Sequence, residues 1–281
     1  MPARNSRRGA DDIGGTGAPP ALESPSFGSF LQQLRARSTR GRRRGGGMSR
    51  AELATLAGRG VSYITKLEQG EAQAPSAAVV ESVADALQVT GAERAHLHDL
   101  STYRPAPAGT AHRSPVSVTD ANRIYVDNLA PALGGFVDVA WNVLYANGAY
   151  TRVYRHIDDP GVGNVLVWLF FVPDSRHIMV EWEQEALLTV SWLRALMVRN
   201  ERTGPDYTTL MHRLARSDEF LTMWRRGQVA LARHKDEMLV RDLDRGTVLH
   251  LHAQVLTWPE PGSSLQLYLG VDVTGNALPS R

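Results

Sequence analysis

The segment from Met48 to Gly70, MSRAELATLAGRGVSYITKLEQG, constrains the fold of this chain more than any other part of it. Ser49 can cap a helix, and Glu52 three positions later completes a capping box, so a helix is expected to begin there. Gly58 and Gly60 then interrupt the helical pattern, and a second short helix follows, which is expected to end at the last glycine of the segment. The segment therefore predicts two short helices joined by a tight glycine turn.

The second helix of this pair has an apolar side and a polar side. Val61, Ile64 and Leu67 recur at helical spacing and form the expected inner stripe. The outward positions carry side chains that reach base edges or phosphates when a helix enters the major groove of DNA; they are Ser62, Tyr63, Thr65 and Lys66. The pattern predicts a helix-turn-helix, and the alternative is an ordinary helical hairpin with a solvated face.

Positive charge is concentrated around these two helices. From Phe27 to Lys66 the chain has nine Arg and Lys residues against one acid, Glu52, whereas the net charge of the whole chain is only +2. Such a field favours a nucleic acid, because each neutralised phosphate releases counterions. Arg42, Arg43 and Arg44 lie between glycines and predict a flexible arm along the DNA backbone or minor groove, unless the segment is only a solvated charged loop.

Four segments in order, AELATLAG, YITKLEQG, PSAAVVESVADAL and ERAHLHDL, resemble the XRE (phage-repressor-like) class of five-helix DNA-binding domains. The resemblance covers about Phe27 to Thr102 and implies an all-α, lambda-repressor-like helix-turn-helix fold with a double-stranded DNA operator as its partner. It also implies base contacts from the second helix and a phosphate contact from Arg50. The full set of expected DNA-binding residues is Arg42, Arg43, Arg44, Arg50, Arg59, Val61, Ser62, Tyr63, Thr65 and Lys66.

Two positions of the turn depart from the pattern of that class. Arg59 stands where a buried aliphatic residue is usual, and Gly60 stands where Ser or Thr usually caps the recognition helix. A Gly cap costs only a few tenths of a kcal/mol relative to Ser, so the fold is expected to survive with a looser turn. Arg59 is free to reach a phosphate instead.

Length and composition predict two domains flanked by unstructured segments. A chain of 281 residues commonly holds about two domains. Residues 1–26 have almost no large apolar side chain and predict a disordered tail, and residues 103–121 contain three prolines among small polar residues, as linkers do. We therefore expect a helix-turn-helix domain over residues 27–102 and a second domain over residues 122–273.

The composition also narrows the class of protein. The chain has no cysteine, which excludes disulfides and thiolate metal sites. It has neither the apolar core of a secretory signal nor a run of about 18 apolar residues, so no membrane insertion is expected. A cytoplasmic protein is the expectation.

The second domain has a different chemistry from the first. All six tryptophans follow the linker, and the net charge from Pro105 onward is −2, so this part is not expected to bind phosphates. FVDVAWNVLYAN alternates and predicts one strand with Val137, Val139 and Trp141 on one face. The 27 residues after Pro173 predict one long helix, and MLVRDL, TVLHLHAQVLTW and SLQLYLGVD predict closing strands. About five antiparallel strands with helices on one side form the expected α+β fold.

This second domain also resembles a known family. DVAWN, GNVLVWLFFVPDS with VEWEQEA, SWLRA, SDEFLTMW and the closing strands resemble the MmyB-like ligand-binding domain. The resemblance implies a PAS-like α+β fold and a fatty acid or another apolar small molecule as ligand. The usual His-Pro before the closing strands is absent, and Arg241 and Asp242 stand near that place.

Bulky apolar residues of this domain are the candidates for a ligand pocket, because small-molecule pockets are lined mostly by apolar and aromatic side chains. Any single tryptophan is also explained as core. Arg194, if buried, needs an anion such as a ligand carboxylate, and the alternatives are that it pairs with a glutamate or is exposed to solvent. The expected ligand-binding residues are Trp141, Asn142, Trp168, Met179, Trp182, Trp192 and Arg194.

No pattern in the chain favours catalysis. Glu181, Glu183 and Glu185 lie on the predicted long helix, and acid-base catalysis needs a convergence of carboxylates that sequence alone does not show. His250 and His252 share a strand face, but no third metal ligand is spaced near them. No phosphate loop or nucleophile elbow is present. We expect no enzyme activity, no cofactor and no bound metal.

Two classes of function remain open at this point. In the first, a homodimeric transcription factor binds a palindromic operator, and an apolar effector in the second domain changes the geometry of the dimer. In the second, the C-terminal domain is a dimerisation or protein-recruitment module without a small ligand.

Overall fold

The computed structural model describes residues 25–40, 47–72, 74–103, 116–200, 207–233, 235, 237–259 and 264–274. The expected tail up to residue 24, the three arm residues Arg42, Arg43 and Arg44, and residues 104–115 of the expected linker lie outside this range. The described helices are α1 (Phe27–Arg37), α2 (Arg50–Leu56), α3 (Val61–Glu68), α4 (Ala77–Leu87), α5 (Gly91–Thr102), α6 (Asp120–Asp127), α7 (Gly148–Val153), α8 (Val165–Phe171), α9 (Asp174–Ile178), α10 (Trp182–Arg199), α11 (Tyr207–Leu214) and α12 (Asp218–Arg225); the strands are β1 (Leu133–Val137), β2 (Val143–Ala146), β3 (Glu237–Asp242), β4 (Thr247–Thr257) and β5 (Gln266–Asp272).

The first five helices form an all-helical domain, as the sequence predicts. The apolar residues of α1 recur at i, i+3, i+4 and i+7 and are all buried against the other helices; they are Phe27, Phe30, Leu31 and Leu34. Ser49 caps α2 and forms the predicted capping box with Glu52. The turn that follows requires Gly58, whose φ is +62°. The helix-turn-helix is thus α2 and α3.

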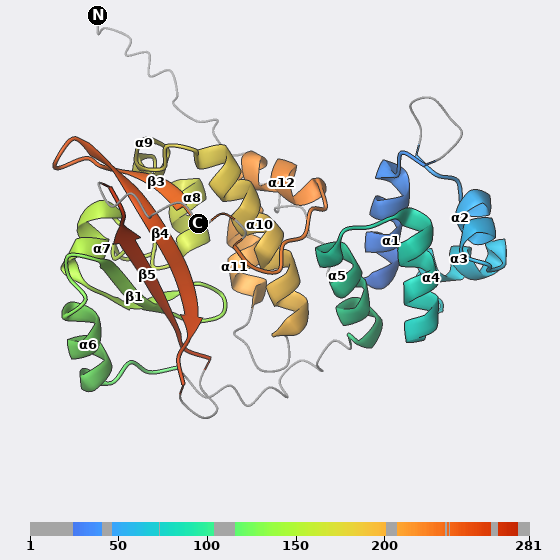
Figure 1. The fold of residues 1–281 in the computed structure, drawn as a ribbon, viewed down its shortest axis with the longest axis horizontal. Coiled ribbons are helices and arrows are strands. Elements are labelled where there is room, and N and C mark those ends of the chain that lie inside the picture. Colours follow the sequence, from blue (N-terminus) through green and yellow to red (C-terminus); the bar gives the residue numbers. More distant parts are fainter. Residues whose placement is uncertain are drawn as a thin grey trace, which may run out of the picture.

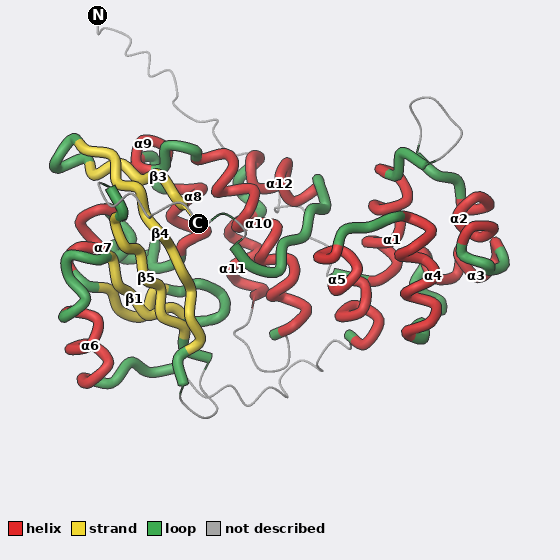
Figure 2. Tube along the Cα trace, in the orientation of Figure 1, coloured by secondary structure: helices red, strands yellow, loops and turns green. Residues whose placement is uncertain are grey.

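The remaining elements form an α+β domain with one antiparallel sheet of five strands, in the order β2-β1-β5-β4-β3 (Figures 1 and 2). The three closing strands lie where the sequence predicts them. Leu133 and Val137 of β1 face α7, α8 and α10, and Phe136 faces the other side of the sheet.

The expectation of helices on one side of the sheet is wrong in one respect. Helix α6 covers the opposite face, where Val126 packs with Phe136 and Leu267. Thr119 caps this helix, which begins at Asp120, two residues inside the predicted linker. Both faces of β1 are therefore buried, which explains why all five of its residues are inaccessible.

The predicted single strand around Trp141 is instead a hairpin of β1 and β2. The Asp138 carboxylate accepts hydrogen bonds from the backbone N–H groups of Ala140 (2.8 Å) and Asn142 (3.0 Å), which closes a tight turn. Trp141 takes a left-handed φ of +58° within it. The turn thus reverses the chain, and Trp141 still packs in the same core as Val137, with which alternation groups it.

The predicted long helix after Pro173 is also interrupted. Met179 forms an isolated bridge with Val240, and the N–H of Val180 donates to the carbonyl of Leu239 at 3.1 Å. These bonds to the edge of β3 replace helical ones and separate α9 from α10. The apolar run NVLVWLFF is helix α8, and α11 was not predicted from the sequence.

The two domains contact each other through α5 and α10. Val198 joins the apolar core of the helical domain, and the Arg199 Nε lies 2.7 Å from an Asp99 carboxylate oxygen. Gly227 comes so close to Gln33 of α1 that a Cβ atom there would clash with its side chain. Helices α2 and α3 lie at the end of the molecule farthest from the sheet (Figure 1).

Within the described residues, no helix combines the length and the apolar character needed to cross a bilayer.

Candidate DNA-binding surface and ligand pocket

Helix α3 presents a polar face at one end of the molecule. Ser62 and Lys66 are exposed, and Tyr63 and Thr65 are half-buried at the edges of the same face. Ile64 and Leu67 lie on the inner side, fully buried in the helical core. The face carries donors and acceptors on a helix that nothing in the described part of the chain covers.

Val61 does not belong to the inner stripe that the sequence predicts. Its side chain is 48% exposed at the first turn of α3. Ile64 and Leu67 are the fully buried apolar residues of this helix, which makes just over two turns. Val61 is therefore on the same open side as Ser62 and adds an apolar group to the surface that we expect to face DNA.

Part of the basic charge of this region holds the fold together. Glu68, at the end of α3, is fully buried in its side chain and bonds both Arg35 of α1 (2.6 Å) and Arg50 of α2 (2.6 Å). Arg35 also donates to the carbonyl of Met48 at 2.7 Å. The carboxylate thus joins the first three helices, and Arg50, expected at a phosphate, is already paired with it.

Two other cations near α3 are available to a ligand. Arg59 and Lys66 are exposed and make no ion pair with any residue that the structure describes. Gly60 caps α3 without a side-chain hydrogen bond, as expected from the absence of Ser or Thr. Arg37 and Arg40 instead contact Glu93 and the carbonyl of Ala86.

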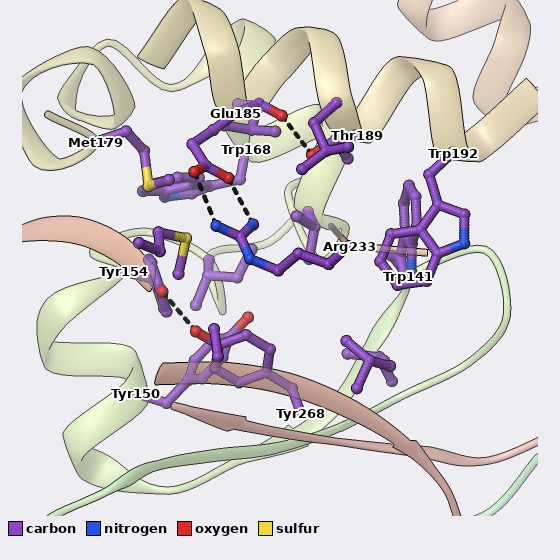
Figure 3. Close-up of a pocket in the computed structure, with 18 residues that line it drawn as sticks. Trp141, Tyr150, Tyr154, Trp168, Met179, Glu185, Thr189, Trp192, Arg233 and Tyr268 are labelled. Atoms are coloured by element: carbon purple, nitrogen blue, oxygen red, sulfur yellow. Dashed lines mark hydrogen bonds and ion pairs between the residues drawn. The ribbon is translucent and has the colours of Figure 1, made fainter. Parts of the chain in front are cut away.

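A cavity of about 110 Å³ lies in the α+β domain, between the sheet and helices α7, α8 and α10. Apolar and aromatic side chains dominate its wall (Figure 3). The lining residues are Val137, Trp141, Tyr150, Tyr154, Ile157, Val165, Trp168, Leu169, Met179, Glu185, Leu188, Thr189, Trp192, Arg233, Met238, Ala253, Val255 and Tyr268.

Four of the candidate ligand-binding residues meet at this cavity. The rings of Trp141 and Trp192 pack edge to face, with 5.1 Å between their centroids. The indole N–H of Trp168 donates to the carbonyl of Arg155 at 2.7 Å, which fixes the ring against the wall. Met179 reaches the cavity from the break between α9 and α10.

Three candidates do not line the cavity. Asn142 bonds the carboxylate of Asp138 (2.8 Å) and the amide of Asn164 (2.9 Å), so it holds the hairpin turn. Trp182 packs on Phe170, with its N–H on the carbonyl of Leu169 at 3.1 Å. Arg194, the third, faces the helical domain rather than the sheet.

Arg194 is buried at the contact between the two domains, with 6% of the residue exposed. Its guanidinium lies 3.9 Å from the centroid of the Trp224 ring and donates to the carbonyl of the same residue. It makes no ion pair within the described residues. Burial and then the charge of Arg37 lower the pKa of Arg194 to about 10.

His96 of α5 lies in the same contact. It is 1% exposed and packs edge to face on Phe30. Burial, followed by the charges of Arg194 and Arg199, lowers its pKa to about 3, so the imidazole is neutral at physiological pH.

Sequence reasoning missed the polar part of the cavity wall. Glu185 of α10 accepts two hydrogen bonds from Arg233, at 2.6 and 2.8 Å. The hydroxyls of Tyr154 and Tyr268 are 2.9 Å apart (Figure 3). The tyrosines were visible only as apolar helix or strand residues, and Arg233 precedes β3 without any motif.

The other charged candidates do not converge on a reacting centre. Glu181 pairs with Lys235, and Glu183 lies 3.5 Å from Arg226 on the surface. His250 and His252 lie on the outer side of β4, and the described residues hold no group of three potential metal ligands. Arg241 and Asp242 stand outside the cavity wall, where Asp242 caps the turn after β3.

Comparison with known families gives two matches. A family model described as a helix-turn-helix domain matches residues 26–97, and one described as the MmyB-like transcription regulator ligand binding domain matches residues 118–271, more than half of the chain. A search of curated proteins found no match.

Proposed function

Because the chain belongs to the MmyB-like transcription regulators, which are DNA-binding and not enzymes, we propose that it regulates transcription in response to an apolar small molecule such as a fatty acid or a related acyl compound. The cavity beneath α10 is the expected ligand site, and the exposed face of α3 is the expected base-reading surface.

The observation that supports this proposal is the position of α10 between the two sites. Leu188, Thr189 and Trp192 of this helix line the cavity. Val198 and Arg199, two turns later, contact the helical domain. A ligand that shifts α10 changes the contact with α5, and through it the placement of α3 on DNA.

We further propose that the protein acts as a homodimer in the cytoplasm. Two copies of α3 on one face of DNA read a palindromic operator, and the spacing of the half-sites is then set by the dimer. The three arginines of the expected arm, Arg42 to Arg44, add contacts to the DNA backbone. Replacing all three by alanine is expected to weaken binding to every DNA sequence and to reduce its dependence on salt.

Native mass spectrometry of the purified full-length protein tests the ligand. A bound mass of lipid size that solvent extraction removes is the expected result. Its removal and return should change affinity for the operator in a gel-shift titration.

An empty cavity in protein that stays dimeric after extraction, with operator binding indifferent to every acyl compound added, contradicts ligand sensing. That outcome favours a C-terminal domain that serves dimerisation or recruits another protein.

A further inference from the structure

The only formal charges on the cavity wall, among the residues described there, neutralise each other. Glu185 and Arg233 form a two-point ion pair in which both carboxylate oxygens accept from the two terminal guanidinium nitrogens (Figure 3). The side chain of Glu185 is 4% exposed and that of Arg233 is 17% exposed. Neither charge is left over for a ligand.

The described charged residues next to this ion pair also neutralise each other. Lys235 lies 3.9 Å from Glu185, but its closer partner is the carboxylate of Glu181. Neither Lys235 nor Glu181 lines the cavity. Among the described residues, the charges on the polar side of the cavity therefore balance before any ligand enters.

The donors that remain for a ligand are the Nε–H of Arg233, whose charge Glu185 already balances, and the hydroxyls of three tyrosines. When the Tyr154 and Tyr268 hydroxyls share one hydrogen bond of 2.9 Å, one of the two protons is still free to be donated. The Tyr150 hydroxyl makes no hydrogen bond with any described residue, and in Figure 3 the three hydroxyls gather beneath the Arg233 guanidinium. Burial raises the pKa of Tyr150 and Tyr154 above the ordinary value and that of Tyr268 to about 12, so all three stay protonated.

Binding of an ionised head group is unfavourable in this arrangement. A carboxylate that accepts from the Arg233 Nε–H would lose its hydration beside a guanidinium whose charge Glu185 already balances, and one that displaces Glu185 would leave that glutamate buried and unpaired. A carbonyl or hydroxyl group makes its hydrogen bonds with the tyrosines at no such cost.

We propose that the cavity binds a neutral amphiphile, an alcohol, ester or amide of an acyl chain, in preference to the free fatty acid anion. This proposal rests on the ligand-sensing function above and specifies its ligand. At roughly 10–15 Å³ for each water-sized group, a cavity of about 110 Å³ holds a chain of about eight carbons.

The test compares probes of one chain length that differ in charge. Extracted full-length protein is titrated at pH 8 with octan-1-ol, octanamide and octanoate, by calorimetry and by intrinsic tryptophan fluorescence, to which Trp141, Trp168 and Trp192 of the cavity wall contribute. Octanoate is ionised at this pH. We expect the neutral probes to bind at least about tenfold more tightly than octanoate.

A charge substitution reverses the preference if the ion pair is its cause. Glu185→Gln leaves the Arg233 guanidinium without its acid, so octanoate affinity is expected to rise at least about tenfold while octan-1-ol affinity changes little. Glu183→Gln, an exposed carboxylate on the same helix outside the cavity, is the matched control.

A second variant tests the proposal even if Glu185→Gln does not fold. Tyr150→Phe removes one hydroxyl and is expected to weaken octanamide several-fold. Tyr125→Phe, on α6 and outside the cavity, is expected to change nothing.

The outcomes separate this proposal from the function on which it rests. If octanoate binds the unaltered protein as tightly as octan-1-ol and octanamide, the neutral head group is overturned and ligand sensing stands. If no probe binds and no bound mass accompanies the purified protein, both proposals fail.

Discussion

The two domains each bury a glutamate against arginine, but they use the pair differently. Glu68 joins α1, α2 and α3 through Arg35 and Arg50 and leaves the polar face of α3 turned outward. Glu185 pairs with Arg233 on the wall of an internal cavity. The helical domain thus keeps its free polar groups on its surface, whereas the α+β domain keeps polar groups inside a cavity, and our proposal assigns DNA selectivity to the first and ligand selectivity to the second.

The largest expected effect concerns the first of these pairs. Replacing Glu68 by alanine leaves Arg35 and Arg50 without their shared acid, and breaking a buried pair costs about 3–5 kcal/mol. Because Arg50 is partly exposed, we expect a loss near about 3 kcal/mol in the free energy of unfolding of the helical domain. Hydrogen exchange of α1 to α3 in the full-length protein measures it.

Glu71→Ala, an exposed acid in the turn after α3, is the control and is expected to cost less than about 0.5 kcal/mol. Equal protection in the two variants would show that Glu68 does not organise the three helices.

The second prediction concerns the contact between the domains. The pKa of His96 is about 3 in the folded protein and about 6.5 when unfolded, so the unfolded chain binds more protons between these values. The contribution to stability is therefore complete above pH 6.5 and is lost as pH falls. From pH 7 to pH 5 the loss is about 2 kcal/mol, since one pKa unit is about 1.36 kcal/mol.

Urea unfolding of the wild-type protein and of His96→Phe at pH 5 and pH 7 measures this loss. The substitution should remove about that share of the pH dependence, whereas His212→Phe, an exposed histidine on α11, should leave it unchanged. The same slope in His96→Phe and wild type would disprove the role of His96.

The third prediction tests whether selectivity lies on the surface of the helical domain. Tyr63→Ala should weaken binding to the preferred operator by about 1 kcal/mol relative to random DNA, because it removes a side chain from the proposed base-reading face. Lys66→Ala should weaken all DNA and reduce the salt slope by about 1. Neither should alter binding of octan-1-ol.

Fluorescence anisotropy with operator and scrambled duplexes gives both quantities. Arg225→Ala, an exposed cation at the end of α12, is the control for charge alone. Unchanged selectivity in Tyr63→Ala would contradict the assignment of α3 to the groove.

The smallest expected effect is at the cap of α3. Gly60→Ser supplies the missing side-chain acceptor, and its extended backbone (φ −76°, ψ 145°) suits a capping serine. We expect a gain of about 0.3 kcal/mol in stability, measured by thermal unfolding. The control is Ser76→Gly at the N-cap of α4, where the serine makes no side-chain capping hydrogen bond. Its loss of stability should be smaller than the gain from Gly60→Ser, and an equal or larger loss would show that the missing bond at Gly60 is unimportant.

The helical domain was largely predictable from sequence because its determinants are local. The spacing of Phe27, Phe30 and Leu31 and the capping box of Ser49 act within one or two turns. The bond from Glu68 to Arg35 was not predictable, because it joins residues 33 positions apart whose types are common on helix surfaces.

In the α+β domain, the three closing strands were predictable, the hairpin of β1 and β2 was not, and the cavity was predictable only in part. Trp141 reaches the cavity through a turn closed by Asp138, and Met179 through a bridge to Val240, and neither follows from periodicity. Arg233 and Tyr268 reach the wall through long-range packing, which a sequence pattern of period 2 or 3.6 does not encode.

Helix α10 limits how the two domains of this chain can be combined with domains of other regulators. Its 18 residues extend about 27 Å as one rigid element, which belongs to the cavity at its beginning and to the helical domain at its end. A chimaera that joins this ligand domain to another DNA-binding domain at the linker alone would leave Val198 and Arg194 facing a surface that does not fit them. The α+β domain and the helical domain are separate folds, but they are not interchangeable. A functional chimaera has to keep the face of α5 that contacts α10.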